Sequence, residues 1–334
     1  RDLTFAIDNL GDYARTDKSR IDRQTAYGLR ARAYMNMEEW ALAASDASKA
    51  AAGYVPAAMN EVARPSFYEI SEHNWIWGYD MTSDIAMKNP YATSSAWIRS
   101  FSGDGYSAGT QVYSCINNLL YDKIPSTDVR KGWWVDASLE SPLLSAVTWN
   151  GVSGNAVAAL EIDNVKMKFL PYTNVKFGMA AVGGTLNDDD WPLMRVEEMI
   201  LIQAEGLAKS GSENQAKALL EDFVRTYRDP VYSADASGRS LTDEIWFQRR
   251  VELWGEGFSN SDTRRLGKPL VRFHADSYSN VPSAFRFNMR ADDGWWLLRF
   301  TSSEMNTNLA IIDNTGGTQP VQYQNGELRD GVTD

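Results

Sequence analysis

Apolar residues recur at helical spacing near the start of the chain. Two faces with a period of 3.6 residues lie within the first 55 positions: Ala26, Leu29 and Ala33 form the first, and Trp40, Ala43, Ala47 and Ala50 form the second. Asp22 precedes the first face as a suitable N-cap, and Gly53 follows the second as a helix-ending glycine. The pattern therefore predicts two antiparallel helices that pack closely, because alanine side chains let backbones approach.

A second helical region begins after Pro192. One face contains Leu193, Val196, Ile200, Ala204 and Leu207, and the next contains Ala216, Leu219, Leu220, Phe223, Val224 and Tyr227. Ala204 and Ala216 are 12 positions apart, and so are Ala31 and Ala43 in the first region. Small residues repeated in this way are typical of tetratricopeptide-type helix pairs. A third helix is predicted over 243–257, with Thr242 as its N-cap.

The middle of the chain, residues 60–190, has no such period. It is rich in Gly, Ser, Asn and Trp, with short β-like runs at 74–77 and 165–170. The predicted fold class is mainly α, in which tetratricopeptide-like helix pairs form a scaffold around an irregular, loop-rich segment with a few short strands. We expect one domain over 1–334, made of a helical pair (1–55), the loop-rich segment (60–190) and a C-terminal helical segment (191–334). Function is expected in the loops rather than in the scaffold.

Composition and charge exclude several classes of protein. The 334 residues are 43% hydrophobic, which is enough for a sizeable core. A net charge of −11 argues against nucleic acid as a binding partner and against a basic surface that binds membranes. The single Cys115 and the two histidines exclude Cys₄ zinc and multi-histidine metal centres. No run approaches the ~18 apolar residues of a membrane helix, and no signal peptide is evident at the start; we expect that the chain begins partway into a domain.

Catalytic motifs such as Gly-x-Ser-x-Gly and His-Glu-x-x-His are missing from the sequence. Paired carboxylates could hydrolyse glycosides, and the candidates are Glu197 with Glu198, Glu252 with Glu256, and Asp188, Asp189 and Asp190. Glu252 and Glu256 lie one helical turn apart among arginines that include Arg249 and Arg250, which favours an ion-pair network between helices. The aspartates favour a solvated helix entry, with a calcium site as the alternative. We predict no catalytic residue, cofactor or metal.

Aromatic residues are the strongest compositional anomaly, with 12 Trp, 15 Tyr and 12 Phe. A flat ring can cover the apolar face of a pyranose while polar neighbours bond its hydroxyls. The segment 89–113 mixes rings with Ser, Gly, Asp and Arg in this way, whereas Trp75 and Trp77 are expected in the core. The predicted ligand-binding residues are Tyr91, Trp97, Arg99, Phe101, Asp104 and Tyr106. The alternative is that these rings fill a core made of loops.

Several segments together resemble the SusD/RagB family. They are Gln24–Tyr54, Leu193–Ala208, Ile245–Phe258 with Asp262 and Arg264–Gly267, and Trp296–Asn308 with Glu304. Gln248, Leu266 and Thr301-Ser302 depart from the Glu, Trp and Pro that are usual in the family. The family also has a lipidated N-terminal cysteine and further residues before its first helix pair, so we expect this chain to lack its N-terminal part.

The resemblance implies a tetratricopeptide-built, lipid-anchored glycan-binding protein on the outer face of a Bacteroidetes-type outer membrane. It would sit as a lid on a SusC-like TonB-dependent transporter and bind glycan without cleaving it. Glu252, Glu256, Arg249 and Arg250 would then lock helices together rather than contact ligand. Two other classes stay open at this point: a glycoside hydrolase that uses paired carboxylates, and a tetratricopeptide scaffold that binds a protein or peptide.

Overall fold

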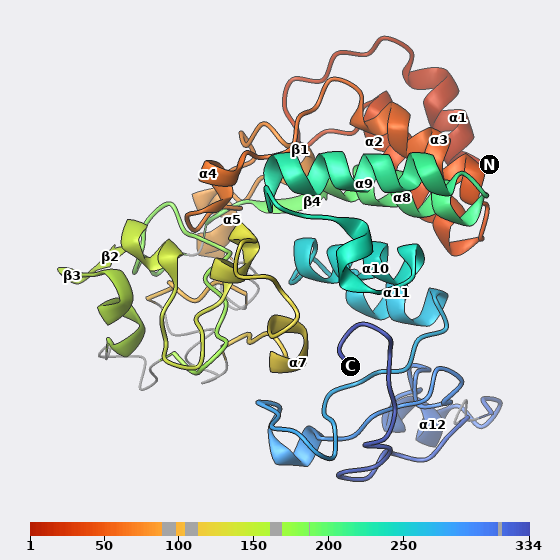
Figure 1. Cartoon of the computed structure of the whole chain (residues 1–334). Coiled ribbons are helices and arrows are strands. Elements are labelled where there is room, and N and C mark those ends of the chain that lie inside the picture. The colour runs from red at the N-terminus through yellow and green to blue at the C-terminus, as the bar shows by residue number, and fades with distance from the viewer. Residues whose placement is uncertain (89–97, 104–112, 161–168, 187, 313–315) are drawn as a thin grey trace. The chain divides into compact units, whose positions relative to one another are not determined.

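The computed structural model describes residues 1–88, 98–103, 113–160, 169–186, 188–312 and 316–334. Its contacts divide the chain into two compact units. The first unit comprises residues 1–116 and 124–257, and the second comprises 117–123 and 258–334. The arrangement of the helices and strands is shown in Figure 1. The expectation of a single domain with three segments stays a prediction.

Helices dominate the described residues of the first unit, which also form two small antiparallel sheets. Its α-helices are α1 (Asp2–Leu10), α2 (Arg23–Asn36), α3 (Trp40–Ala51), α4 (Met59–Val62), α5 (Ser83–Lys88), α8 (Val196–Lys209), α9 (Glu213–Tyr227) and α10 (Leu241–Glu252). Its strands are β1 (Trp75–Tyr79), which pairs with β4 (Trp191–Arg195), and β2 (Thr148–Trp149), which pairs with β3 (Val152–Ser153). No helix in the described residues is both long and apolar enough to cross a bilayer.

The predicted helix pairs are confirmed, and they stack on one another. Helix α2 packs on α3, α3 on α8, and α8 on α9, as the red and green helices of Figure 1 show. The alanines that predicted close crossings, Ala31, Ala43, Ala204 and Ala216, are all 0% exposed. A Cβ built on Gly206 of α8 would lie 2.5 Å from the carbonyl oxygen of Trp40. The stack is therefore a tetratricopeptide-like scaffold in which backbones touch.

The ends of the helices agree with the sequence in part. Asp22 caps α2 by accepting a hydrogen bond from the Thr25 N–H at 2.8 Å, as predicted. Helix α10 is instead capped by Ser240, whose hydroxyl accepts from the Asp243 N–H at 3.1 Å, so Thr242 as the cap is wrong. The helix also ends at Glu252 rather than at residue 257, because residues 253–257 turn through two glycines with positive φ.

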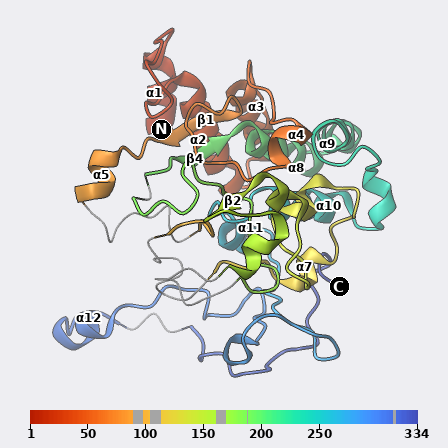
Figure 2. The same ribbon diagram turned by 90° about the vertical axis from the view of Figure 1, so that its left-hand side faces the viewer.

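Residues 191–195 are a strand, although their apolar pattern continues that of the following helix. They form β4, which lies beside β1 in both views (Figures 1 and 2). Trp75 pairs with Arg195, and the register shifts twice along β1. Trp75 and Ile76 are both fully buried, which confirms Trp75 as a core residue, while Trp77 is half-buried. The β-like run predicted at 165–170 lies mostly outside the described residues.

The second unit is built mainly from loops. Its α-helices are α7 (Asn118–Tyr121), α11 (Ser259–Arg265) and α12 (Ser302–Thr307). The buried Asn288 holds this unit together: its side chain accepts from the Arg272 N–H at 2.8 Å and donates to the carbonyls of Phe273 and Asn325, each at 2.9 Å.

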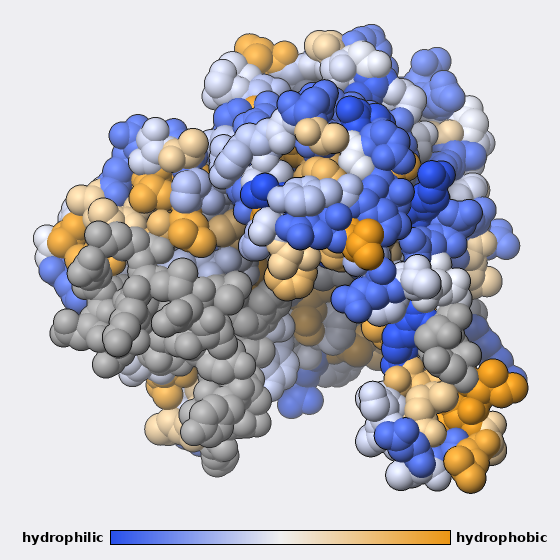
Figure 3. Space-filling model, turned by 90° about the horizontal axis from the view of Figure 1, so that it is seen from below, coloured by the Kyte–Doolittle hydropathy of each residue, from blue (hydrophilic) through white to orange (hydrophobic). Residues whose placement is uncertain are grey.

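Figure 3 shows one face of the molecule, on which hydrophilic residues are interrupted by small hydrophobic patches.

Candidate functional site

Only part of the predicted ligand-binding segment lies within the described residues. Tyr91, Trp97, Asp104 and Tyr106 lie outside them. Phe101 is described and is 0% exposed; its ring packs 6.4 Å from that of Trp149 and 6.0 Å from that of Phe169, between centroids. Phe101 therefore packs in the core, which is the alternative that the sequence left open for the rings of this segment.

Arg99 is also buried, at 1% exposure. Its guanidinium donates to the carbonyls of Phe67, at 3.0 Å, of Gly178, and of Asp190, at 2.6 Å. Burial lowers the pKa of Arg99 to about 10, although nearby Asp189 favours the charged form. Arg99 thus ties three backbone segments together. Whether Arg99 or Phe101 contributes to ligand binding stays a prediction.

A buried network of ion pairs joins the helical stack to the loops. Glu252 lies at its centre and accepts from Arg228 (2.8 and 3.0 Å), Arg195 (3.1 Å) and Arg130 (3.3 Å), all 0% exposed. Burial alone would raise the pKa of Glu252, but the three guanidiniums, Arg228 first, hold it well below the usual range. An ion-pair network around Glu252 is therefore confirmed, but these three arginines come from distant parts of the chain, whereas the prediction rested on neighbours such as Arg249 and Arg250.

Lys176 contributes an ammonium to this network. It donates to Glu256 at 2.7 Å and to the carbonyls of Glu252 and Trp254, both at 2.9 Å. Three ring centroids surround the nitrogen: Phe67 at 4.9 Å, Trp133 at 4.7 Å and Phe177 at 4.9 Å. Burial lowers the pKa of Lys176 to about 8, although Glu256 acts in the opposite direction. The residue joins the loop-rich segment to the end of α10.

The other carboxylates considered for hydrolysis are also bound within the protein. Glu197 is 0% exposed and accepts hydrogen bonds from the Ala57 N–H, the Asn74 amide and Arg228. Glu198 accepts from Arg32, and Asp188 accepts from the Ser83 hydroxyl. Backbone N–H groups bind the other two aspartates: that of Ala180 donates to Asp189, and those of Ile70 and Met81 donate to Asp190. A glycosidase needs an acid and a base that reach the scissile bond from two sides. Glu197 and Glu198 are buried and bound by arginines, whereas the aspartates are bound by Ser83 or by backbone N–H groups, with Asp188 and Asp190 only partly buried.

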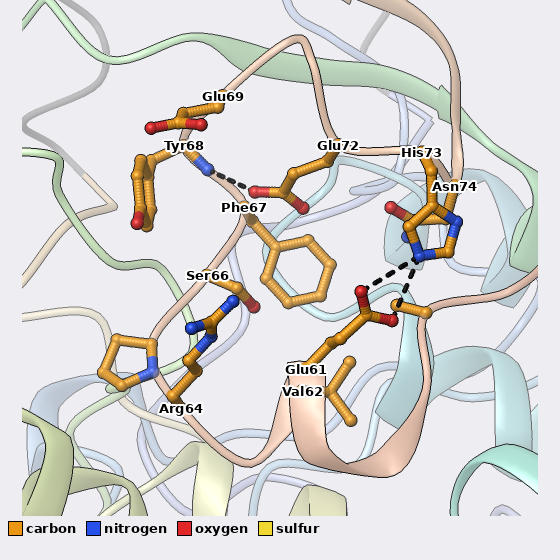
Figure 4. Close-up of a pocket in the computed structure, with 12 residues that line it drawn as sticks. Glu61, Val62, Arg64, Ser66, Phe67, Tyr68, Glu69, Glu72, His73 and Asn74 are labelled. Carbon is orange, nitrogen blue, oxygen red and sulfur yellow. Dashed lines mark hydrogen bonds and ion pairs between the residues drawn. The ribbon is translucent and has the colours of Figure 1, made fainter.

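A polar hollow lies between α4 and β1 (Figure 4). It encloses about 110 Å³ and is formed by one continuous stretch of the first unit. Its lining residues are Ala57, Glu61, Val62, Arg64, Pro65, Ser66, Phe67, Tyr68, Glu69, Glu72, His73 and Asn74. The local chain path explains the shape: Phe67 has a φ of 63°, which turns the backbone sharply. Its ring is buried and faces Arg195 and Lys176 of the ion-pair network.

Two carboxylates of the hollow have different environments. Glu61 accepts from the Ala58 N–H at 2.7 Å and lies 3.0 Å from His73 Nε2, and these contacts, the N–H first, lower its pKa. Glu72 accepts from the Tyr68 N–H at 3.0 Å, but burial raises its pKa. Figure 4 shows these two carboxyl groups on opposite sides of the Phe67 ring in that view.

The hollow presents mostly carboxylate acceptors, and each of them already accepts a hydrogen bond within the protein. Sequence reasoning missed it, although the charged run from Glu61 to His73, directly before a buried strand, is visible in the sequence. In the described residues no group of three or more side chains is arranged to hold a metal ion.

Comparisons with known proteins place the chain in a family. A family model described as "SusD family" matches residues 144–317, just over half of the chain. Among solved structures, a SusD-like carbohydrate-binding protein from Bacteroides vulgatus is 21% identical, with a TM-score of 0.67, over 93% of this chain and 63% of its own. A SusD superfamily protein from Bacteroides thetaiotaomicron is 19% identical, with a TM-score of 0.61, over 94% and 64%. A putative sugar-binding protein from B. vulgatus is 20% identical, with a TM-score of 0.64, over 95% and 64%.

At these identities the solved structures establish a shared fold. The chain spans less than two thirds of the length of each of these three proteins. No curated protein matches the chain significantly. The family model and the tetratricopeptide-like stack agree with the resemblance found in the sequence, and the chain belongs to the SusD family.

Proposed function

We propose that this chain is a glycan-binding protein without catalytic activity. The observation that carries the proposal is its membership of the SusD family. It is supported by two similar structures, one described as a SusD-like carbohydrate-binding protein and one as a putative sugar-binding protein. The ion-pair network supports a binding role, because it occupies Glu197, Glu252 and Glu256, three of the carboxylates that a hydrolase could use.

In this proposal the protein acts in nutrient uptake at the outer face of the outer membrane. A lipid anchor outside this chain holds it there, and a SusC-like TonB-dependent transporter receives the glycan from it. A rigid helical stack suits such a role, because it keeps the ligand-binding loops in place and does not itself change shape.

The ligand would contact the loop-rich segment. Tyr91, Trp97 and Tyr106 would stack on sugar rings, with Asp104 bonding hydroxyls, as we expect from the sequence. The polar hollow adds a set of hydrogen-bonding groups in the same half of the chain.

Two measurements test the proposal. A glycan array screened with the chain should show binding to at least one class of glycan, and native gels that contain that glycan should retard the protein. Incubation of the protein with the same glycan should release no new reducing ends. New reducing ends would favour a glycoside hydrolase, and binding to no glycan on the array would favour a scaffold for proteins or peptides.

A further inference from the structure

Three aromatic side chains of the second unit are more than half exposed. They are Tyr278 at 65%, Phe285 at 58% and Tyr323 at 54%. A single exposed apolar side chain is normal on a protein surface. Three exposed rings on neighbouring segments of one small unit instead form a surface suited to contact with another molecule.

Arg286 connects the segments that carry these rings. Its guanidinium donates to the carbonyl of Ser279 at 2.8 Å, and its own carbonyl accepts from the Tyr323 N–H at 2.5 Å. Tyr278 directly precedes Ser279 in the chain, and Phe285 directly precedes the arginine. Each of the three rings therefore belongs to a residue that contacts Arg286 or is adjacent to one that does.

Further contacts hold two of these residues in place. The Arg272 guanidinium donates to the Phe285 carbonyl at 3.3 Å. The Tyr323 ring packs edge-on against the ring of the buried Phe273, with 5.9 Å between their centroids. A ring that is already held in place loses little conformational entropy when a ligand binds to it.

The backbone at Tyr323 has an unusual conformation. Its φ is 64°, in a region that residues with a bulky side chain rarely adopt. Asn325, two positions later, has a φ of 58°, which asparagine tolerates more easily. Strained residues of this kind persist where the surrounding structure enforces them, and they are concentrated at functional sites. The turn at 323–325 therefore keeps the half-exposed Tyr323 ring in a fixed place, as a ligand-contacting ring requires.

The composition of the segments 278–287 and 321–325 indicates the chemistry of the ligand. Arg286 is their one charged residue, in a chain with a net charge of −11. Apart from it and the tyrosines, their polar side chains are hydroxyls and amides: Ser279, Asn280, Ser283, Gln322, Gln324 and Asn325. Hydroxyls and amides exchange hydrogen bonds with sugar hydroxyls, and aromatic rings cover the apolar face of a pyranose. The charge of the whole chain repels anionic glycans and anionic lipid surfaces, so a neutral glycan fits best.

We infer that the second unit has a glycan-binding surface of its own, on which Tyr278, Phe285 and Tyr323 stack on the sugar rings of a neutral glycan. This inference rests on the proposed function and adds a second contact region to the predicted one at 89–113. A glycan bound at these three rings needs no contact with residues 89–113. The two regions should therefore make separate contributions to affinity.

The test measures the affinity of the full chain for four hexasaccharides: maltohexaose, cellohexaose, xylohexaose and the hexamer of galacturonic acid. We expect at least one of the three neutral sugars to bind, and to bind more tightly than the galacturonate. Tyr278→Ala, Phe285→Ala and Tyr323→Ala, combined in one variant, should lower that affinity at least about tenfold, equivalent to about 1.4 kcal/mol. Unchanged affinity in this triple variant, or no binding of any neutral hexasaccharide, overturns the inference and leaves the proposed function to the wider array. Binding to no glycan on that array overturns both.

Phe5→Ala is the matched control for the loss of an exposed ring. Phe5 lies on α1 of the first unit and is 69% exposed, so its removal should leave the affinity unchanged. If Phe5→Ala weakens binding as much as Phe285→Ala does, any exposed ring binds sugar, and the inference fails.

Two further measurements separate binding from folding and from self-association. The melting temperature of the triple variant should change little, because the three rings are exposed. If it falls, the single variants Tyr278→Ala and Phe285→Ala decide, since each should lower the affinity about threefold at an unchanged melting temperature. Size-exclusion chromatography tests the other occupant: a triple variant that changes from dimer to monomer and keeps its glycan affinity would assign the rings to an interface between two copies and overturn the inference.

Discussion

Gly206 of α8 lies directly against Trp40 of α3. A Cβ at position 206 would sit 2.5 Å from the Trp40 carbonyl oxygen, 2.9 Å from the Ala44 Cβ and 3.0 Å from the Ala44 nitrogen. Two of these atoms belong to the backbone and the third is the Ala44 Cβ. None of them can move out of the way by a side-chain rotation, as the end of a long side chain could. The two helix pairs therefore meet at a point where glycine is required.

Gly206→Ala should destabilise the protein, against the usual preference of helices for alanine. Alanine is better than glycine by about 1 kcal/mol inside a helix, but an added methyl group in a packed crossing costs about 1–3 kcal/mol. We expect urea unfolding to show a lower free energy for this variant. Gly28→Ala in α2 is the matched control, because its new methyl meets the flexible end of Met194 and not a backbone. A Gly206→Ala variant as stable as Gly28→Ala would contradict the close crossing.

Lys176→Met should cause a large loss of stability. The substitution removes a buried ammonium that contacts Glu256 and two carbonyls. Glu256 keeps its hydrogen bonds from Arg195, at 2.8 and 2.7 Å. Removing one partner of a buried ion pair costs about 3–5 kcal/mol. Lys217→Met is the control: Lys217 pairs with exposed Asp235, and such surface pairs contribute about 1 kcal/mol or less. Equal losses in the two variants would show that the buried ammonium is unimportant.

The same lysine makes stability depend on pH in a defined direction. Its pKa is about 8 in the folded protein, whereas a lysine in an unfolded chain has a pKa of 10.5. Between these values the unfolded chain binds more protons, so the free energy of unfolding rises with pH. Below about 8 both states are charged, and the contribution is constant. The wild type should therefore gain stability relative to Lys176→Met from pH 8 upward, by at most about 1.4 kcal/mol per pH unit. A constant difference up to pH 10 would be the contrary result.

The helix pairs could be predicted because their signal is local. Alanines at fixed spacing mark the crossing in the sequence itself, and Asp22 caps the helix that it precedes. The strand at 191–195 could not be predicted in this way. Its apolar positions also fit the next helix, and what makes it a strand is pairing with β1, more than 100 residues earlier in the chain.

The ion-pair network and the hollow also depend on the tertiary structure, so the sequence could predict them only in part. The residue types near Glu252 indicated an ion-pair network, but Arg130, Arg195 and Arg228 come from three separate segments that only the fold brings together. The hollow between α4 and β1 has no periodic pattern, since most of its lining comes from the irregular chain between these two elements. For Phe101 the ring alone does not distinguish packing from stacking on a ligand, and its burial against Trp149 is decided by the tertiary structure.

Trp97 and Phe101 should therefore respond differently to substitution. If Trp97 stacks on a sugar, Trp97→Ala should weaken glycan binding by at least about 2 kcal/mol, as expected for an aromatic residue that dominates an interface, with an unchanged melting temperature. Phe101→Ala should lower the melting temperature instead, because deleting a buried phenylalanine costs about 3–5 kcal/mol. Affinity gels and thermal melts on both variants separate the two roles. A parallel loss of binding and stability in Trp97→Ala would place Trp97 in the core and remove it from the predicted ligand contacts.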